Sequence, residues 1–178
     1  MKRVHAGGAR SDKRRGQAVL EYALLYAGVI LPLTFGIVFV AEMLWVWHSV
    51  VEFTRDGARY AATHCWQADG QNVIQYMQTH VPRTIDMDQL KGVGTAPAQI
   101  VVNYFSRDPD SGSLTDFTCD GECSVDCVPN VVTVRITGYE FRRFVDFLKL
   151  PPVAMPEFPT TLPIESAGCD PEQGTCLP

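Results

Sequence analysis

The sequence predicts an α+β protein in which a long N-terminal transmembrane helix precedes a small antiparallel-sheet domain with disulfides. Residues Tyr22–Ala41 form a run of 20 residues without a charge, and about 20 apolar residues cross a bilayer core. Residues Val132–Thr137 alternate apolar and polar side chains, as a half-buried strand does. All six cysteines lie beyond the apolar run, and an even number of cysteines outside the cytoplasm favours disulfides.

These features divide the 178 residues into three parts. Residues 1–16 form a basic cytoplasmic leader, and residues 17–66 form the long helix, which spans the membrane over about 22–46. Residues 67–178 form an extracytoplasmic α+β domain with a cysteine-rich loop and a proline-rich tail. An ordinary secretory signal is excluded, because the uncharged run is too long and no small-residue cleavage site follows it.

Charge predicts the orientation of the helix in the membrane. The leader holds six Lys or Arg residues against one acidic residue, a net charge of +5, whereas the remaining residues carry nine basic and nineteen acidic side chains, a net charge of −10. Basic residues stay on the cytoplasmic side of a membrane helix. We therefore expect a cytoplasmic N-terminus, and the acidic outer domain argues against nucleic-acid binding.

Two features modify the long helix. Pro32 removes one backbone hydrogen bond, so the helix should bend or loosen there. Trp45 and Trp47, at the end of the apolar run, are typical of an interfacial aromatic belt. Beyond them the helix becomes amphipathic, and Arg55 and Arg59 lie where they can pair with acidic residues one turn earlier.

The outer domain begins after a break at Ala68–Gly70. The elements expected after this break are a helix over Asn72–Val81, a loop over Arg83–Pro97, a strand over Ala98–Phe105, a polar connection over Ser106–Asn130, the Val132–Thr137 strand, a short helix over Glu140–Leu150 and an edge strand over Thr160–Ser166. Strand and helix periodicities carry these assignments.

The cysteines are expected to form disulfides, although fifteen pairings are open. They are Cys65, Cys119, Cys123, Cys127, Cys169 and Cys176. The last two are expected to close a small terminal loop. The spacing of the middle three does not fit common zinc or iron–sulfur sites, and the acidic residues around them lack an EF-hand order, so we expect no metal.

Two segments together resemble the TadE-like family of minor pilins, or pseudopilins, of the tight-adherence (Tad) pilus, a type IV-like pilus. The first is Gly16–Tyr22, Gly-Gln-Ala-Val-Leu-Glu-Tyr, with the apolar helix behind it. The second is Thr54–Ala62, Thr-Arg-Asp-Gly-Ala-Arg-Tyr-Ala-Ala. The resemblance covers residues 14–66, whereas the cysteine-rich loop and tail depart from the family core.

The resemblance implies a role in pilus assembly, priming or adhesion, without catalysis or a cofactor. A prepilin peptidase would cut between Gly16 and Gln17, leaving a type IV pilin-like helix in the bacterial inner membrane and a periplasmic C-terminal domain. Glu21 would pair with the N-terminal ammonium of a neighbouring subunit, and Tyr22 would lie at the membrane interface. The implied partners are other pilins or pseudopilins and the Tad assembly machinery.

Small residues on the outer part of the helix allow two interpretations. Gly57, Ala58, Ala61 and Ala62 could contact a helix of another subunit or pack tightly against the chain's own sheet. Two alternative functions also stay open: a permanently membrane-anchored envelope accessory protein that never enters a fibre, and a membrane-tethered thiol redox enzyme. The second alternative lacks a C-x-x-C pair.

Overall fold

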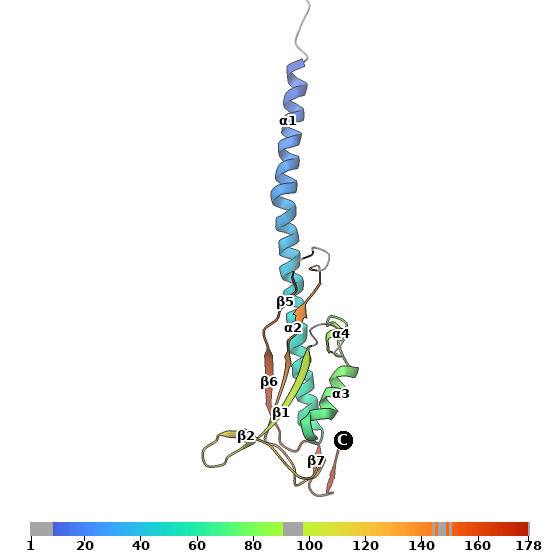
Figure 1. Cartoon of the computed structure of the whole chain (residues 1–178), viewed down its shortest axis with the longest axis vertical. Coiled ribbons are helices and arrows are strands. Elements are labelled where there is room, and N and C mark those ends of the chain that lie inside the picture. Colours follow the sequence, from blue (N-terminus) through green and yellow to red (C-terminus); the bar gives the residue numbers. More distant parts are fainter. Residues whose placement is uncertain (1–8, 91–97, 144, 146–148, 150, 178) are drawn as a thin grey trace, which may run out of the picture. The chain divides into compact units, whose positions relative to one another are not determined.

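The computed structural model describes residues 9–90, 98–143, 145, 149 and 151–177, and for residues 9–15 and 87 it describes the backbone alone. The chain divides into two compact units between Met43 and Leu44. The helical elements are α1 (Ala9–Leu25), the π-helix η1 (Tyr26–Ile30), α2 (Leu31–Thr63), the 3-10 helix η2 (Ala68–Gly70), α3 (Gln71–Thr79) and α4 (Met87–Leu90) (Figure 1). The strands are β1 (Gln99–Arg107), β2 (Leu114–Asp116), β3 (Val131–Thr137), β4 (Glu140–Phe141), β5 (Val153–Ala154), β6 (Phe158–Pro163), β7 (Cys169–Asp170) and β8 (Thr175–Cys176).

The first unit is helical throughout its described residues, and the loosening expected at Pro32 occurs one turn earlier. Helix α1 begins at Ala9, ahead of the start near Gln17 that the apolar run indicated. In η1 the Leu31 N–H bonds the carbonyl of Tyr26, five residues back. A proline ring clashes with the carbonyl four residues before it, and a wider π turn accommodates that clash. The helix therefore continues past Pro32 without ending.

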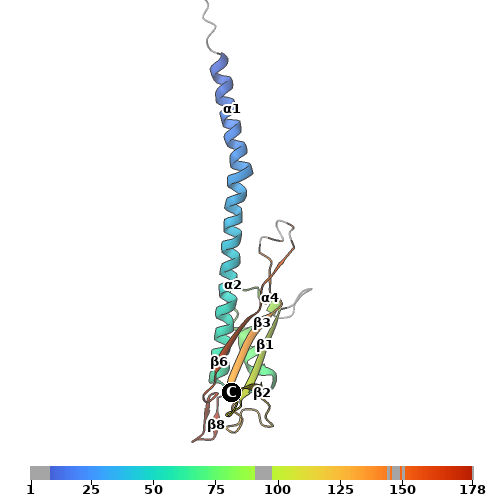
Figure 2. The ribbon, with the colours of Figure 1, turned by 90° about the vertical axis from the view of Figure 1, so that its left-hand side faces the viewer.

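The second unit is built on an antiparallel sheet with the strand order β2-β1-β3-β6. Strands β1, β3 and β6 lie side by side in both ribbon views (Figures 1 and 2). Tyr104 of β1 is opposite Val132, and Val134 is opposite both Val102 and Thr160. This register places Val102, Val134 and Thr160 side by side on one face of the sheet.

That face is buried, as the alternation in β3 predicted. Val132, Val134 and Ile136 are at most 2% exposed, and Thr133 and Arg135 between them are partly exposed. On the other face Thr133 and Thr161 pair across β3 and β6, with 2.9 Å between their Oγ1 atoms. The expected strand with one buried and one wet face is confirmed.

The outer part of α2 covers the buried face. Its buried residues in this unit are Val46, Val50, Phe53, Thr54, Gly57, Ala58 and Ala61. Thr54 and Thr160 are joined by a hydrogen bond of 3.0 Å between their Oγ1 atoms, and the rings of Trp47 and Phe158 meet edge to face at 5.2 Å. Helix α2 is thereby attached to strand β6, a contact between positions more than 100 residues apart in the chain.

The loop expected over Arg83–Pro97 contains helix α4, and positions 91–97 lie outside the described residues. The Gln89 side chain is 2% exposed, donates to the Glu140 carbonyl at 3.0 Å and accepts from the Glu140 N–H at 3.0 Å. The Asp86 N–H donates to the Tyr139 hydroxyl at 2.9 Å, while burial raises the pKa of Tyr139. Long-range hydrogen bonds thus order this segment. The local sequence pattern does not predict that order, because the partners lie about 50 residues further along the chain.

Three further expectations are corrected. Helix α2 ends at Thr63 instead of Trp66, and the connection Ser106–Asn130 contains strand β2, which is exposed and pairs with the end of β1. The helix expected over Glu140–Leu150 begins instead with strand β4, and positions 144, 146–148 and 150 lie outside the described residues. The expected edge strand is present, shifted toward the N-terminus as β6.

Candidate functional site

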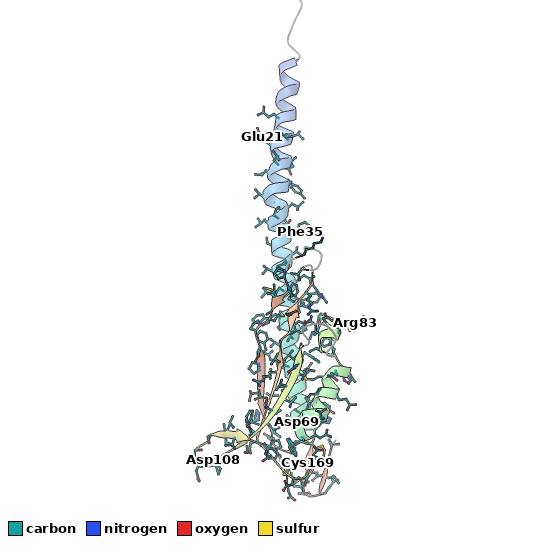
Figure 3. All side chains as sticks on the ribbon, in the orientation of Figure 1. Glu21, Phe35, Asp69, Arg83, Asp108 and Cys169 are labelled. Carbon is teal, nitrogen blue, oxygen red and sulfur yellow. A yellow bond between two sulfur atoms is a disulfide. The ribbon has the colours of Figure 1, made fainter. Side chains whose placement is uncertain are left out.

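The predicted assembly site lies on α1, where Gly16, Gln17, Glu21 and Tyr22 are all exposed. The Gln17 side-chain amide donates to Oε1 of Glu21 at 3.2 Å, across one helical turn. Figure 3 shows the Glu21 side chain standing out from the helix. Tyr22 is 65% exposed, and its ring lies 6.4 Å from the ring of Tyr26. The two residues that would form the new N-terminus and its partner carboxylate therefore lie on one helical face.

Around and beyond this site the helix presents apolar side chains to its surroundings on every side. The segment Gly16–Thr63 is 48 residues long and is the one helix among the described residues that is long and apolar enough to cross a membrane. Its large exposed apolar side chains include Val19, Leu20, Leu24, Leu25, Val29, Leu33, Phe35, Ile37 and Val38. A soluble helix buries at least one apolar face, so this pattern is that of a single-pass membrane protein.

The small residues at the other end of α2 are packed within the chain. Ala58 and Ala61 are at most 1% exposed, and Gly57 is buried against the Met77 side chain of α3, where an added Cβ would overlap the Met77 Sδ. Ala62 is partly exposed. Gly57, Ala58 and Ala61 are thus buried within the chain, and Gly57 fits against helix α3 instead of against the sheet.

The two arginines of the second segment form ion pairs on the exposed side of α2. Arg55 pairs with Glu52, and Nη1 of Arg59 lies 3.3 Å from Oδ1 of Asp56. All four side chains are partly or largely exposed, so each pair adds at most about 1 kcal/mol. The expected salt-bridged face is confirmed.

All six cysteines are in disulfides. The pairs are Cys65–Cys123, Cys119–Cys127 and Cys169–Cys176. The last pair closes the small terminal loop that the sequence indicated, between strands β7 and β8. Cys65 follows the end of α2, so its disulfide anchors the cysteine-rich loop to the helix.

A stack of four aromatic rings, which the sequence did not predict, joins α2 and α3. Tyr60 of α2 and Tyr76 of α3 are parallel, with ring centroids 4.0 Å apart. His64 stacks on Tyr60 at 3.6 Å and His80 on Tyr76 at 4.5 Å. The pattern Tyr-x-x-Thr-His occurs at 60–64 and again at 76–80, and this repetition is the feature that could have predicted the stack.

The two copies of this pattern have the same hydrogen bonds. The Nδ1 atoms of His64 and His80 each lie 2.9 Å from the carbonyl oxygen of the tyrosine four residues earlier. With a proton on Nδ1, each ring donates a hydrogen bond to that oxygen. Nearby, Tyr104 is 6% exposed, and among the described residues its hydroxyl has no hydrogen-bond partner. Burial, together with the neighbouring Tyr60, raises the pKa of Tyr104.

The arrangement therefore offers two candidate sites: the polar head of an exposed apolar helix, and the ring stack between α2 and α3. No protein-family model matches this chain, and no curated protein or solved structure shows significant similarity to it.

Proposed function

We propose that this chain is a minor pilin or pseudopilin of a Tad-type pilus, a single-pass inner-membrane protein that acts by assembly without catalysis. The observation that carries the proposal is the exposed pair Gln17 and Glu21 at the head of a helix whose apolar side chains are uncovered. Such a helix needs lipid or other helices around it. The membrane would surround the helix with lipid first, and a fibre would then surround it with other helices.

The orientation that fits this function has the N-terminus in the cytoplasm and the C-terminal domain in the periplasm. The net charge of +5 in residues 1–16 against −10 in the remainder supports it through the preference of basic residues for the cytoplasmic side. The three disulfides support it as well, because the periplasm is oxidising and the cytoplasm is not. A prepilin peptidase acting from the cytoplasmic side would meet the Gly16–Gln17 bond there.

Cleavage at that bond requires local unwinding, because α1 runs through it without a break. Proteases bind extended backbone, and Gly16 lowers the helix propensity at this point by about 1 kcal/mol relative to alanine. The glycine thus makes the bond easier to expose. If the helix does not unwind, the leader is not cut and the chain is a permanently anchored accessory protein. The unbroken α1 favours this alternative.

After cleavage, Glu21 would gain a strong partner. In the uncut chain its carboxylate accepts a hydrogen bond from the neutral Gln17 amide. The ammonium of a cut neighbouring subunit would replace this contact with an ion pair in a medium of low dielectric constant. An unpaired charge costs several kcal/mol there, so the pair would fix the axial register of adjacent helices.

Substitution of Glu21 tests this role. Glu21→Ala should insert into the membrane in normal amounts, while its quantity in sheared fibres falls by at least about tenfold, because the neighbour's ammonium would have no partner. Quantitative immunoblots of the membrane and fibre fractions measure both amounts. Glu172→Gln, which removes an exposed carboxylate of the tail, is the control and should leave both fractions unchanged. Normal fibre incorporation of Glu21→Ala would rule out the subunit-pairing role.

A further inference from the structure

A groove beside the aromatic stack has a composition unlike that of the domain around it. It has a volume of about 660 Å³ and is lined by ten residues from α2, α3 and the turn between them, helices that lie side by side in Figures 1 and 2. Five of the ten carry amide side chains: Gln67, Gln71, Asn72, Gln75 and Gln78. A volume of this size is in the range of small-molecule sites.

None of the ten lining residues is Asp, Glu, Lys or Arg. This is unusual in a chain with 35 charged residues, counted as 15 Lys or Arg and 20 Asp or Glu. An anionic or cationic ligand would lose hydration on entering without gaining an opposite charge. The groove therefore fits a neutral, polar ligand.

The amides of the groove differ in availability. Asn72 donates to the Cys65 carbonyl at 2.9 Å, and Gln67 points its amide nitrogen at the Cys123 sulfur. Gln71 and Gln75 are exposed on α3, and no hydrogen bond of their side chains occurs within the described part of the chain. Four residues apart, they lie on one helical face, where each offers a donor and an acceptor.

The aromatic stack forms a rigid wall of the groove. Tyr60 and Tyr76 are held face to face, and the histidines at either end are fixed by their Nδ1 contacts with tyrosine carbonyls. Because these rings are already immobilised, little further side-chain entropy is lost on binding. Exposed His80 closes one end of the stack, so one face of its ring is available to a ligand.

From these features we infer that the groove binds a neutral oligosaccharide. Sugar hydroxyls both donate and accept, which matches the amides of Gln71 and Gln75, and the C–H faces of a pyranose pack on a ring such as that of His80. A protein partner would need aromatic or aliphatic anchors, but Tyr60 and Tyr76 are stacked on each other and Ile74 is the one aliphatic residue in the lining. This site is independent of pilus membership, since it lies within residues 44–178 and involves neither Gln17 nor Glu21.

Binding is testable on the purified full-length chain. The protein should be kept in a zwitterionic detergent without a sugar head group, because maltoside detergents would themselves compete. Isothermal titration with chitotriose and with maltotriose distinguishes N-acetylated from unmodified glycans, and at least one should bind with a dissociation constant of about 1 mM or lower. Sialyllactose against lactose tests the preference for a neutral ligand.

Two variants locate the site. The double variant Gln71→Ala/Gln75→Ala should weaken binding by about tenfold, since two hydrogen bonds are lost. Gln99→Ala/Gln173→Ala removes two exposed amides elsewhere in the chain and should bind like the unaltered protein. No binding of either trisaccharide at about 10 mM, equal affinity in both double variants, or tighter binding of sialyllactose than of lactose would each overturn the assignment.

Discussion

The Asp108 side chain holds part of the turn between β1 and β2 (Figure 3). Its Oδ1 accepts hydrogen bonds from the N–H groups of Ser111, at 3.1 Å, and of Asp110, at 2.8 Å. These bonds favour the ionised carboxylate and hold the pKa of Asp108 below its ordinary value. The carboxylate thereby adds two hydrogen bonds to an exposed turn that backbone bonds between Asp108 and Ser113 also hold.

The lowered pKa of Asp108 gives a pH dependence of known sign. Since the folded-state pKa lies below the unfolded one, the contribution to stability is complete above the unfolded pKa and is lost as the pH falls through the folded pKa. We expect NMR titration of the Asp108 carboxyl carbon to give a pKa below about 3.9. A value at or above that level would show that the two N–H bonds do not form in solution.

Among the elements, the close approach of α2 and α3 depends on Gly57 and Met77. Gly57→Ala would gain helix propensity, but its new Cβ would overlap the Met77 side chain, which is fully buried. Overpacking of this kind costs about 1–3 kcal/mol. We expect Gly57→Ala to lower the free energy of unfolding by that amount, measured by denaturant titration of the full chain in detergent.

A second glycine in the same helix serves as a control that distinguishes the effect of steric overlap from the effect of helix propensity. Gly36 lies in the same helix, with nothing within 4 Å of a Cβ built on it, so Gly36→Ala should be neutral or stabilising by up to about 1 kcal/mol. Met77→Ala should cost less in the Gly57→Ala background than in the unaltered chain. If both glycine substitutions stabilise the protein equally, close packing at Gly57 is refuted.

The sequence predicts those elements that are stabilised by their own pattern of apolar residues, and it does not predict those that are stabilised by distant contacts. Strand β3 and helix α3 carry their own periodicity, and their core positions Val134 and Met77 follow from it. Strand β2 and helix α4 do not: the first is exposed along its length, and the second is held by the Gln89 amide on the Glu140 backbone. Such long-range polar contacts leave no local pattern.

Of the two candidate sites, the sequence predicts the one on α1 but not the one between α2 and α3. Gln17 and Glu21 lie four residues apart on one helix, so their contact could be anticipated from spacing alone. The stacking of Tyr60 on Tyr76 depends on how two helices meet, and the groove beside them depends on the turn that joins them. At this turn Gly70 has a φ of +61° and lies against the Val102 side chain. A Cβ at position 70 would overlap that side chain, so only glycine fits there.

On the scale of the whole molecule, the three disulfides differ in how much of the chain they restrain. Cys65–Cys123 joins positions 58 residues apart, whereas Cys169–Cys176 joins positions 7 apart. By chain entropy, removing the first should cost about 4 kcal/mol and removing the second about 2 kcal/mol. Thermal unfolding of the two double Cys→Ala variants, followed by near-UV circular dichroism, measures the order. Equal losses would show that the loop between Cys65 and Cys123 is already restrained in the unfolded chain.

The chain as a whole buries apolar side chains in residues 44–178 and leaves those of the preceding helix uncovered. In water this exposure would be unfavourable by about 25 cal/mol for each Å² of apolar surface, so lipid or neighbouring helices must cover it. Under the proposed function, cleavage at the Gly16–Gln17 bond would distinguish a subunit that enters a fibre from an anchor that keeps its leader.

The mature N-terminus of the protein, determined by mass spectrometry after purification from its native membrane, tests this account most directly. We predict that the first residue is Gln17 with a free amine, the group that would pair with Glu21 of a neighbouring subunit. An intact leader through Gly16, in cells whose prepilin peptidase processes its other substrates, would contradict the assignment as a pilin-like subunit. The chain would then be a permanent membrane anchor.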